Sequence, residues 1–128
     1  MVAATPESAP LVLVIDDVED NRDVYDQFLR HEGWRVALAA DGVEGLTMAA
    51  RLAPSVIVLD LGLPLLDGWE VARRLKDSDL TRNIPLIAVT GHVTKEARDR
   101  AMAAGVDQFC AKPCVPADLV ATIRRHLK

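Results

Sequence analysis

Five short apolar runs alternate along the chain with segments of helical spacing, and this alternation constrains the fold more than any other feature. Most of the runs are continuous, which is typical of strands that are covered on both faces of a sheet. Five strand–helix units in succession predict a parallel sheet with right-handed crossovers, and hence an open, doubly wound α/β fold. We expect the strands at Leu11–Ile15, Trp34–Leu38, Val56–Leu59, Leu86–Val89 and Val106–Cys110.

The segments between these runs carry helix signals. Apolar side chains recur every four positions or so, as on one face of a helix, at Val24 and Phe28, at Val71, Ala72 and Leu75, and at Leu119, Ile123 and Leu127. Two acid pairs have the spacing of an N-cap and its third helical residue, namely Asp41 with Glu44 and Asp67 with Glu70. Gly33 and Gly105 stand where helices should end, and Pro116 suits a first helical turn.

Composition supports one domain with a core of small aliphatic side chains. The 128 residues are half apolar but only 4% aromatic, so Val, Leu, Ile and Ala must form most of the core. We expect residues 11–128 to form the domain and residues 1–10 to be an N-terminal tail. The tail lacks the features of a secretory signal, and no apolar run approaches the length of a membrane span. The predicted compartment is therefore the cytoplasm.

The charge pattern argues against direct binding to nucleic acid. The net charge is −4, from 15 basic and 19 acidic residues, and the basic residues form no stripe. The charged residues of interest instead follow the predicted strands.

Polar residues end four of the five predicted strands. Asp16 and Asp17 follow the first strand, and Asp60, Thr90 and Lys112 stand at the ends of the third, fourth and fifth. In doubly wound sheets such residues converge at the carboxyl edge, where ligands bind. Three carboxylates there would repel one another without a cation, and an oxygen-rich site without His or Cys indicates Mg²⁺. Lys112 and Thr90 could then hold the oxygens of a phosphoryl group.

These residues stand in segments that resemble the receiver domain of bacterial two-component response regulators. The matching segments are "LVIDDVEDNR", "VIVLDLGLPLLDG" around Asp60, "IAVTG" around Thr90 and "FCAKP" around Lys112. The spacings of 30 residues from Asp60 to Thr90 and 22 from Thr90 to Lys112 also match. The resemblance covers Leu11 to Leu127 and implies a flavodoxin-like (βα)5 fold with strand order 2-1-3-4-5.

The resemblance implies that Asp60 accepts a phosphoryl group from a phosphohistidine of a sensor histidine kinase or a histidine phosphotransfer protein. Mg²⁺ would be bound by Asp17, Asp60 and the backbone carbonyl of Gly62, with Asp16 binding directly or through water. Lys112 would contact a phosphoryl oxygen. Such a domain is not an enzyme beyond its own phosphorylation and dephosphorylation.

The family also implies a switch. Thr90 would move toward the phosphoryl group, and the ring of Phe109 would turn into the space that Thr90 leaves. A downstream protein would then bind the face formed by the fourth helix, fifth strand and fifth helix. The bond between Lys112 and Pro113 would be cis.

Three positions depart from the commonest family pattern. Gly62 offers no side chain to the phosphoryl group or to water, Gly91 replaces a frequent Ala, and Phe109 lacks the hydroxyl of a frequent Tyr. Gly62 and His92 border the path of attacking water, so both are predicted to modulate the phosphoryl lifetime. His92 could shield the phosphoryl group or, as a neutral imidazole, steer a water toward it. Of these two roles we expect shielding.

Other interpretations compete with the phosphoacceptor. A phosphorylation-independent pseudo-receiver usually lacks one of the site residues, all of which are present here. A small aspartyl-phosphate phosphatase would have its two acids separated by one residue and a cap domain. A nucleotide-binding flavodoxin-like domain would need a Gly-rich loop after the first strand, where this chain reads "DDVEDNR".

The chain has two cysteines, Cys110 and Cys114, on either side of Lys112 and Pro113. Two thiols alone make a poor zinc site, and cytoplasmic thiols are usually reduced. We therefore expect reduced thiols with a structural or incidental role.

Overall fold

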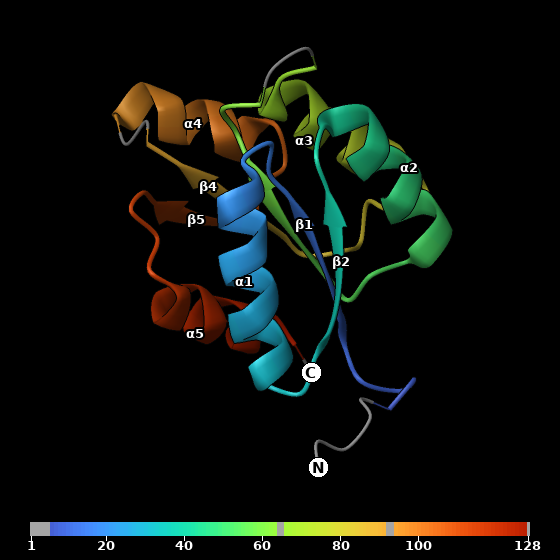
Figure 1. Ribbon diagram of the computed structural model, residues 1–128. Helices are drawn as coiled ribbons and strands as arrows, with labels where there is room; N and C mark the ends of the chain where they lie inside the picture. The colour runs from blue at the N-terminus through green and yellow to red at the C-terminus, as the bar shows by residue number, and fades with distance from the viewer. Residues whose placement is uncertain (1–5, 64–65, 92–93, 128) are drawn as a thin grey trace.

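The computed structural model describes residues 6–63, 66–91 and 94–127, and its centre is one parallel sheet (Figure 1). The strand order is β2–β1–β3–β4–β5, as the family resemblance implied. The strands are β1 (Leu11–Ile15), β2 (Arg35–Ala39), β3 (Val56–Asp60), β4 (Leu86–Thr90) and β5 (Gln108–Ala111). The register places β1 between β2 and β3, with Leu13 beside both Ala37 and Ile57. The order therefore reverses between β1 and β3, where a doubly wound sheet forms its binding crevice.

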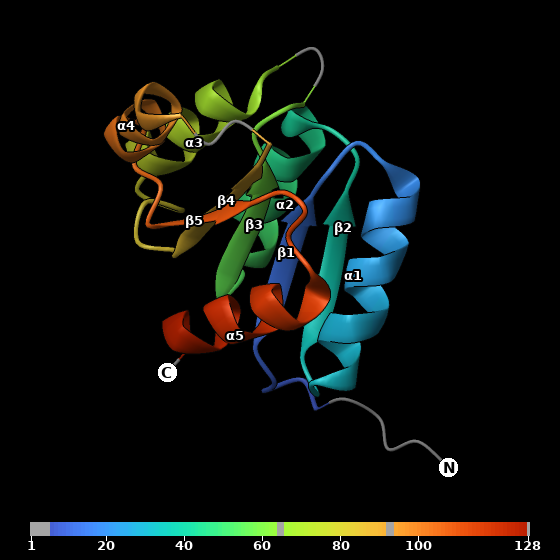
Figure 2. The same ribbon diagram turned by 90° about the vertical axis from the view of Figure 1, so that its left-hand side faces the viewer.

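Helices cover both faces of the sheet (Figure 2). One face carries α1 (Glu19–His31) and α5 (Pro116–His126), and the other carries α2 (Gly42–Leu52), α3 (Gly68–Asp77) and α4 (Lys95–Ala103). Right-handed crossovers between parallel strands place helices on both faces when the strand order reverses.

Alternate strand residues supply two separate cores. Leu13, Ile15 and Leu59 pack toward α2, α3 and α4, whereas Val12 and Val14 pack toward α1 and α5. Because successive side chains in a strand point to opposite faces, a strand covered on both sides must be apolar throughout. This explains why the runs in the sequence are continuous.

The helix boundaries follow the predicted capping chemistry. The side chain of Asp41 accepts a hydrogen bond from the backbone N–H of Glu44 at 2.8 Å, and Asp67 accepts one from that of Glu70 at 2.9 Å. Each bond satisfies an amide that has no partner within its helix. Gly105 has a φ of +98°, the left-handed conformation that often ends a helix.

One predicted helical face was wrong. Val24 and Phe28 of α1 are 44% and 48% exposed, whereas Tyr25 and Leu29, one position later, are buried. Tyr25 can be buried because its hydroxyl donates a hydrogen bond to the backbone oxygen of Cys114 at 3.3 Å. The apolar residues at 24 and 28 therefore remain on the surface.

Element boundaries differ slightly from those predicted. Trp34 and Val106 are buried but precede β2 and β5, which begin at Arg35 and Gln108. Leu127 caps α5 instead of continuing it. None of the helices in the described part of the chain has the length and apolar character needed to cross a bilayer.

Candidate functional site

The polar residues predicted at strand ends do lie at one edge of the sheet. Asp16 and Asp17 directly follow β1, Asp60 ends β3, Thr90 ends β4, and Lys112 directly follows β5. All five strands are parallel, so their carboxyl ends meet at the same edge.

Three carboxylates form a cluster at this edge. Asp16, Asp17 and Asp60 each offer an oxygen, and these oxygens lie within 4.8 Å of one another. Asp16 and Asp60 are only 3% and 4% exposed, whereas Asp17 is exposed. Burial raises the pKa of Asp16, and the nearby charge of Asp60 raises it further, although hydrogen bonds from Val18 and Asn21 oppose the shift. A divalent cation bound to oxygen ligands would relieve this repulsion, so the donor set fits Mg²⁺.

Asp16 is fixed by three hydrogen bonds from its own loop and α1. Its Oδ1 accepts from the backbone N–H of Val18 at 2.9 Å, and its Oδ2 accepts from Asn21 Nδ2 at 3.3 Å. Its backbone oxygen accepts from Arg22 Nη1 at 2.7 Å. The sequence interpretation missed Asn21 and Arg22. Both residues lie in the first turn of α1, which follows Asp16 and Asp17 and faces the end of β1. This position in the sequence could have indicated their contact with Asp16.

Asp60 and Lys112 form an ion pair across the sheet edge. Lys112 Nζ lies 2.9 Å from Asp60 Oδ2, while Asp60 Oδ1 accepts a hydrogen bond from the Gly62 amide at 2.8 Å. Partial burial disfavours the charged form of Lys112, but the hydrogen bond and negative charge of Asp60, together with Asp16, outweigh it and raise the pKa of Lys112. Lys112 therefore stays protonated beside the candidate acceptor.

Thr90 and Phe109 lie on the adjoining strands. Thr90 is 1% exposed, and its backbone oxygen accepts a hydrogen bond from the Lys112 amide at 2.8 Å. Phe109 is partly buried against the core on the side of α4, and the Arg98 guanidinium carbon lies 5.6 Å from its ring centroid. The predicted modulator His92 lies outside the described residues.

Gly68, at the start of α3, is a second residue that the sequence interpretation missed. A Cβ added there would lie 2.4 Å from Leu61 Cα and 2.7 Å from the backbone oxygen of Asp60. These atoms belong to the backbone, so the loop after Asp60 would have to move. Because Gly68 has no side chain, the start of α3 can pack directly against the loop that follows Asp60.

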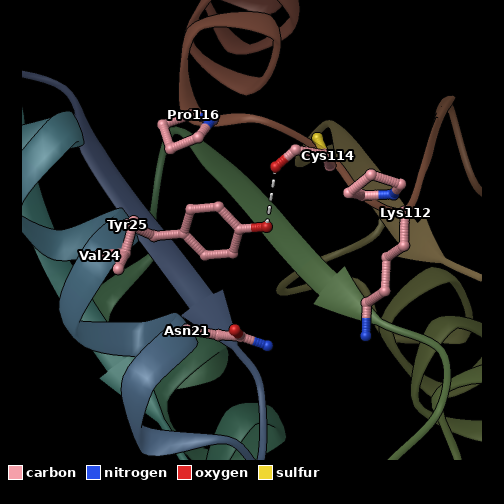
Figure 3. A pocket seen from close by; sticks show the side chains of 7 residues that line it. Asn21, Val24, Tyr25, Lys112, Cys114 and Pro116 are labelled. Carbon is pink, nitrogen blue, oxygen red and sulfur yellow. Dashed lines mark hydrogen bonds between the residues drawn. The ribbon is translucent and has the colours of Figure 1, made fainter.

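A pocket opens beside Lys112, between α1 and the loop from β5 to α5 (Figure 3). Its volume is about 530 Å³, and its lining includes Asn21, Val24, Lys112 and Pro116. The peptide bond between Lys112 and Pro113 is cis, as the family resemblance implied.

The two cysteines are not free thiols in this structure. Cys110 and Cys114 form a disulfide with Cα atoms 6.0 Å apart. The expectation of two reduced thiols was therefore wrong for this form. The chain bends back at the loop after β5, so residues four apart in the sequence come into bonding distance.

Known proteins resemble the chain in both sequence and structure. Residues 12–124 match the profile of the response regulator receiver domain family. The chain is 37% identical over 113 residues to the response regulator PleD of Caulobacter vibrioides. This match covers 88% of the chain and 25% of PleD. It is 36% identical over 124 residues to the transcriptional regulatory protein PrrA of Mycobacterium tuberculosis, with 97% of this chain and 52% of PrrA covered. The chain therefore spans about a quarter to a half of these two curated relatives.

Solved structures show the same architecture. The chemotaxis protein CheY4 of Vibrio cholerae superposes with a TM-score of 0.89 at 28% identity, covering 94% of this chain and all of CheY4. The receiver domain of the sensor histidine kinase PA1611 from Pseudomonas aeruginosa has a TM-score of 0.84 at 31% identity, covering 92% and 97% of the two chains. The latter was solved with magnesium coordinated in its active-site cleft.

Proposed function

Because the chain belongs to the response regulator receiver family, we propose that residues 11–128 are a phosphoacceptor domain that takes a phosphoryl group from phosphohistidine onto Asp60. The observation that carries the proposal is the 2.9 Å ion pair between Lys112 and Asp60, next to two further carboxylates. Receiver domains interact with histidine kinases or phosphotransfer proteins, and such a protein in the cytoplasm is the proposed donor.

Each residue of the site has a separate role in the proposed phosphoryl transfer. A carboxylate oxygen of Asp60 attacks phosphorus and forms an O–P bond, while the P–N bond breaks and its electron pair stays on the imidazole. The Lys112 ammonium contacts a phosphoryl oxygen and offsets its charge, and the Thr90 hydroxyl donates to another. Magnesium, when bound, supplies positive charge at the same oxygens, and Asp17, Asp60 and the Gly62 carbonyl would hold it, with Asp16 binding directly or through water.

The proposed donor docks beside α1. The pocket between α1 and the loop after β5 opens next to Lys112. Apolar side chains are exposed at Val18, which precedes α1, and at Val24 and Phe28 within it. A helix carrying phosphohistidine could cover these side chains while its imidazole reaches Asp60. Phe28→Ala should slow transfer from a phosphorylated phosphotransfer protein but leave transfer from acetyl phosphate unchanged. Equal slowing with both donors would exclude this docking face.

The acceptor is tested with acetyl phosphate and Mg²⁺. Intact-protein mass spectrometry should show one added phosphoryl group, which is lost in Asp60→Asn and kept in the matched control Asp79→Asn, whose carboxylate is exposed. Labelling of Asp60→Asn would move the acceptor elsewhere. No labelling of the parent would favour the pseudo-receiver, and repeated turnover of p-nitrophenyl phosphate would favour the phosphatase.

The proposed output surface comprises α4, β5 and α5. Thr90 and Phe109 lie on β4 and β5, and Phe109 contacts Arg98 of α4, so their movement has a short route to that surface. A phosphoryl group can shift the equilibrium only by its differential binding to the two states. Beryllofluoride, which mimics the phosphoryl group, should change amide NMR shifts in residues 95–126. Changes confined to the pocket would argue against this output surface.

A further inference from the structure

The disulfide between Cys110 and Cys114 encloses the lysine of the candidate site. Cys110 lies in β5, and Cys114 follows the bend after Lys112 and Pro113, so Lys112 stands at the middle of the closed ring. The same lysine makes the 2.9 Å contact with Asp60. The covalent link therefore spans the segment whose shape sets the position of the ammonium group.

Both cysteines are packed against the rest of the domain. Cys114 is 7% exposed, and Cys110 is partly buried against the same core, on the side of α1 and α5. The Tyr25 hydroxyl donates to the backbone oxygen of Cys114 at 3.3 Å, and Figure 3 shows this bond between α1 and the loop. The disulfide thus joins β5 to a loop position that is already anchored to α1, and the Lys112 segment is held at both ends.

The proposed cytoplasmic compartment favours a reversible role for this disulfide. Disulfides in cytoplasmic proteins are usually transient and are often redox-sensing, because the thiol pool reduces them. Cys114 also lines the pocket beside Lys112, and Cys110 is the more exposed of the two cysteines. A small thiol or disulfide thus has a route to this part of the molecule.

We propose that Cys110 and Cys114 form a redox-responsive modification site whose oxidation holds Lys112 in position for phosphorylation of Asp60. The inference rests on the proposed phosphoacceptor function. It assigns to the two cysteines a role that the acceptor chemistry itself does not require.

The oxidant is a low-molecular-weight disulfide such as glutathione disulfide. The Cys110 thiolate attacks one oxidant sulfur, forms a mixed disulfide and releases one thiolate. The Cys114 thiolate then attacks the Cys110 sulfur, forms the intramolecular bond and releases the second thiolate. Two electrons pass from the cysteines to the oxidant, and the two protons that the cysteines lose are taken up by the two released thiolates.

Reduction removes the covalent link across the Lys112 segment, which is then held by the hydrogen bond from Tyr25 to Cys114 and by that from the Lys112 amide to Thr90. The ammonium group then samples positions away from Asp60, and only a fraction of the molecules has it in place. If that fraction is about one third, phosphorylation slows about threefold, because the rate is scaled by the competent population.

Two measurements on the purified full chain test the proposal. Incubation in glutathione buffers of graded redox ratio, followed by alkylation of free thiols and mass spectrometry, reports the disulfide without reference to phosphorylation. Phosphorylation by acetyl phosphate and Mg²⁺ is then timed for the oxidised and the reduced protein. We expect the oxidised protein to react about threefold faster. The double variant Cys110→Ser/Cys114→Ser should react at the reduced rate in every buffer.

The outcomes are distinguishable. Equal rates for oxidised and reduced wild type, or a disulfide that never forms in buffers as oxidising as the cytoplasm becomes under oxidative stress, would overturn the redox inference and leave the acceptor intact. The absence of phosphorylation in both states, with the disulfide still titrating, would instead overturn the acceptor. Thermal unfolding of the double variant separates a folding defect from a change in rate, and the wild-type comparison needs no substitution.

Discussion

The helices α4 and α5 border the same strand but are attached to the domain in different ways. Within α4 only Ala101 is buried, whereas α5 buries Leu119, Val120, Thr122 and Ile123. Instead of large buried side chains, α4 has two cation–π contacts. Arg98 lies over the ring of Phe109, and Arg100 lies over the ring of Trp69. Such contacts are weaker than the burial of large side chains, so we expect α4 to be less firmly held than α5.

This difference suits the proposed function, in which the phosphorylation state of Asp60 alters an output surface. In that proposal the less firmly held α4 provides the two-state element, and the more firmly held α5 preserves the site. The four predictions below test the difference, from the largest expected effect to the smallest.

Shortening one buried side chain in each helix should separate the two attachments most clearly. Leu119→Ala leaves a cavity in the core under α5 and should lower the free energy of unfolding by about 2 to 5 kcal/mol. Ala101→Gly removes only a methyl group and adds backbone freedom, so it should cost about 1 to 2 kcal/mol. Urea unfolding measures both values. Equal losses would show that α4 is as firmly anchored as α5.

The connection between α4 and β5 depends on Asp107. Its Oδ2 accepts hydrogen bonds from the backbone N–H of Leu86 at 2.8 Å and from Lys76 Nζ at 3.0 Å. Asp107→Ala leaves the partly buried Leu86 amide without this acceptor and should cost about 1 to 2 kcal/mol. Asp107→Asn keeps an acceptor and should cost less. Hydrogen exchange should accelerate in α4 before α5; faster exchange in α5 first would contradict the comparison.

The contact between Arg98 and Phe109 should bias the switch. Arg98→Ala removes a cation–π contact of about 0.5 to 1 kcal/mol that favours the present ring position. If the proposed switch requires the ring to leave that position, beryllofluoride should bind about two- to fivefold more tightly to this variant. Arg100→Ala is the matched control, because Arg100 contacts Trp69 instead. Unchanged affinity in Arg98→Ala, measured by fluorescence titration, would remove Arg98 from the switch.

The smallest effect concerns the charged surface of α3, against which α4 packs. Hydrogen bonds from Arg73 and then Arg74 lower the pKa of Glu70 to about 2 from its usual 4.5. A lowered folded-state pKa contributes stability above the unfolded value, and this contribution is lost as the pH falls toward about 2. The Glu70 side chain lies at the surface and is 30% exposed, so solvent screens its ion pairs and the contribution is small. NMR titration should show Arg73→Ala raising this pKa, whereas an unchanged midpoint would assign the shift to Arg74.

The sequence alone determined the elements and the residues at their ends. Continuous apolar runs predict strands with two covered faces, and the carboxyl ends of parallel strands must share an edge. The convergence of Asp16, Asp60, Thr90 and Lys112 at one edge was therefore predictable from local pattern and handedness, together with the family resemblance. The capping pairs, such as Asp41 with Glu44, depend on neighbours within one turn and were equally accessible.

Only the tertiary structure decided which side chains face one another. The spacing of α1 allowed either Val24 with Phe28 or Tyr25 with Leu29 as its buried face. The choice depended on Tyr25 finding a hydrogen-bond acceptor at Cys114, 89 positions away in the chain. The disulfide likewise depended on the bend after β5, and the need for Gly68 on how closely α3 approaches the Asp60 loop. Periodicity describes one element at a time, whereas these outcomes depend on distances between elements that are far apart in the sequence.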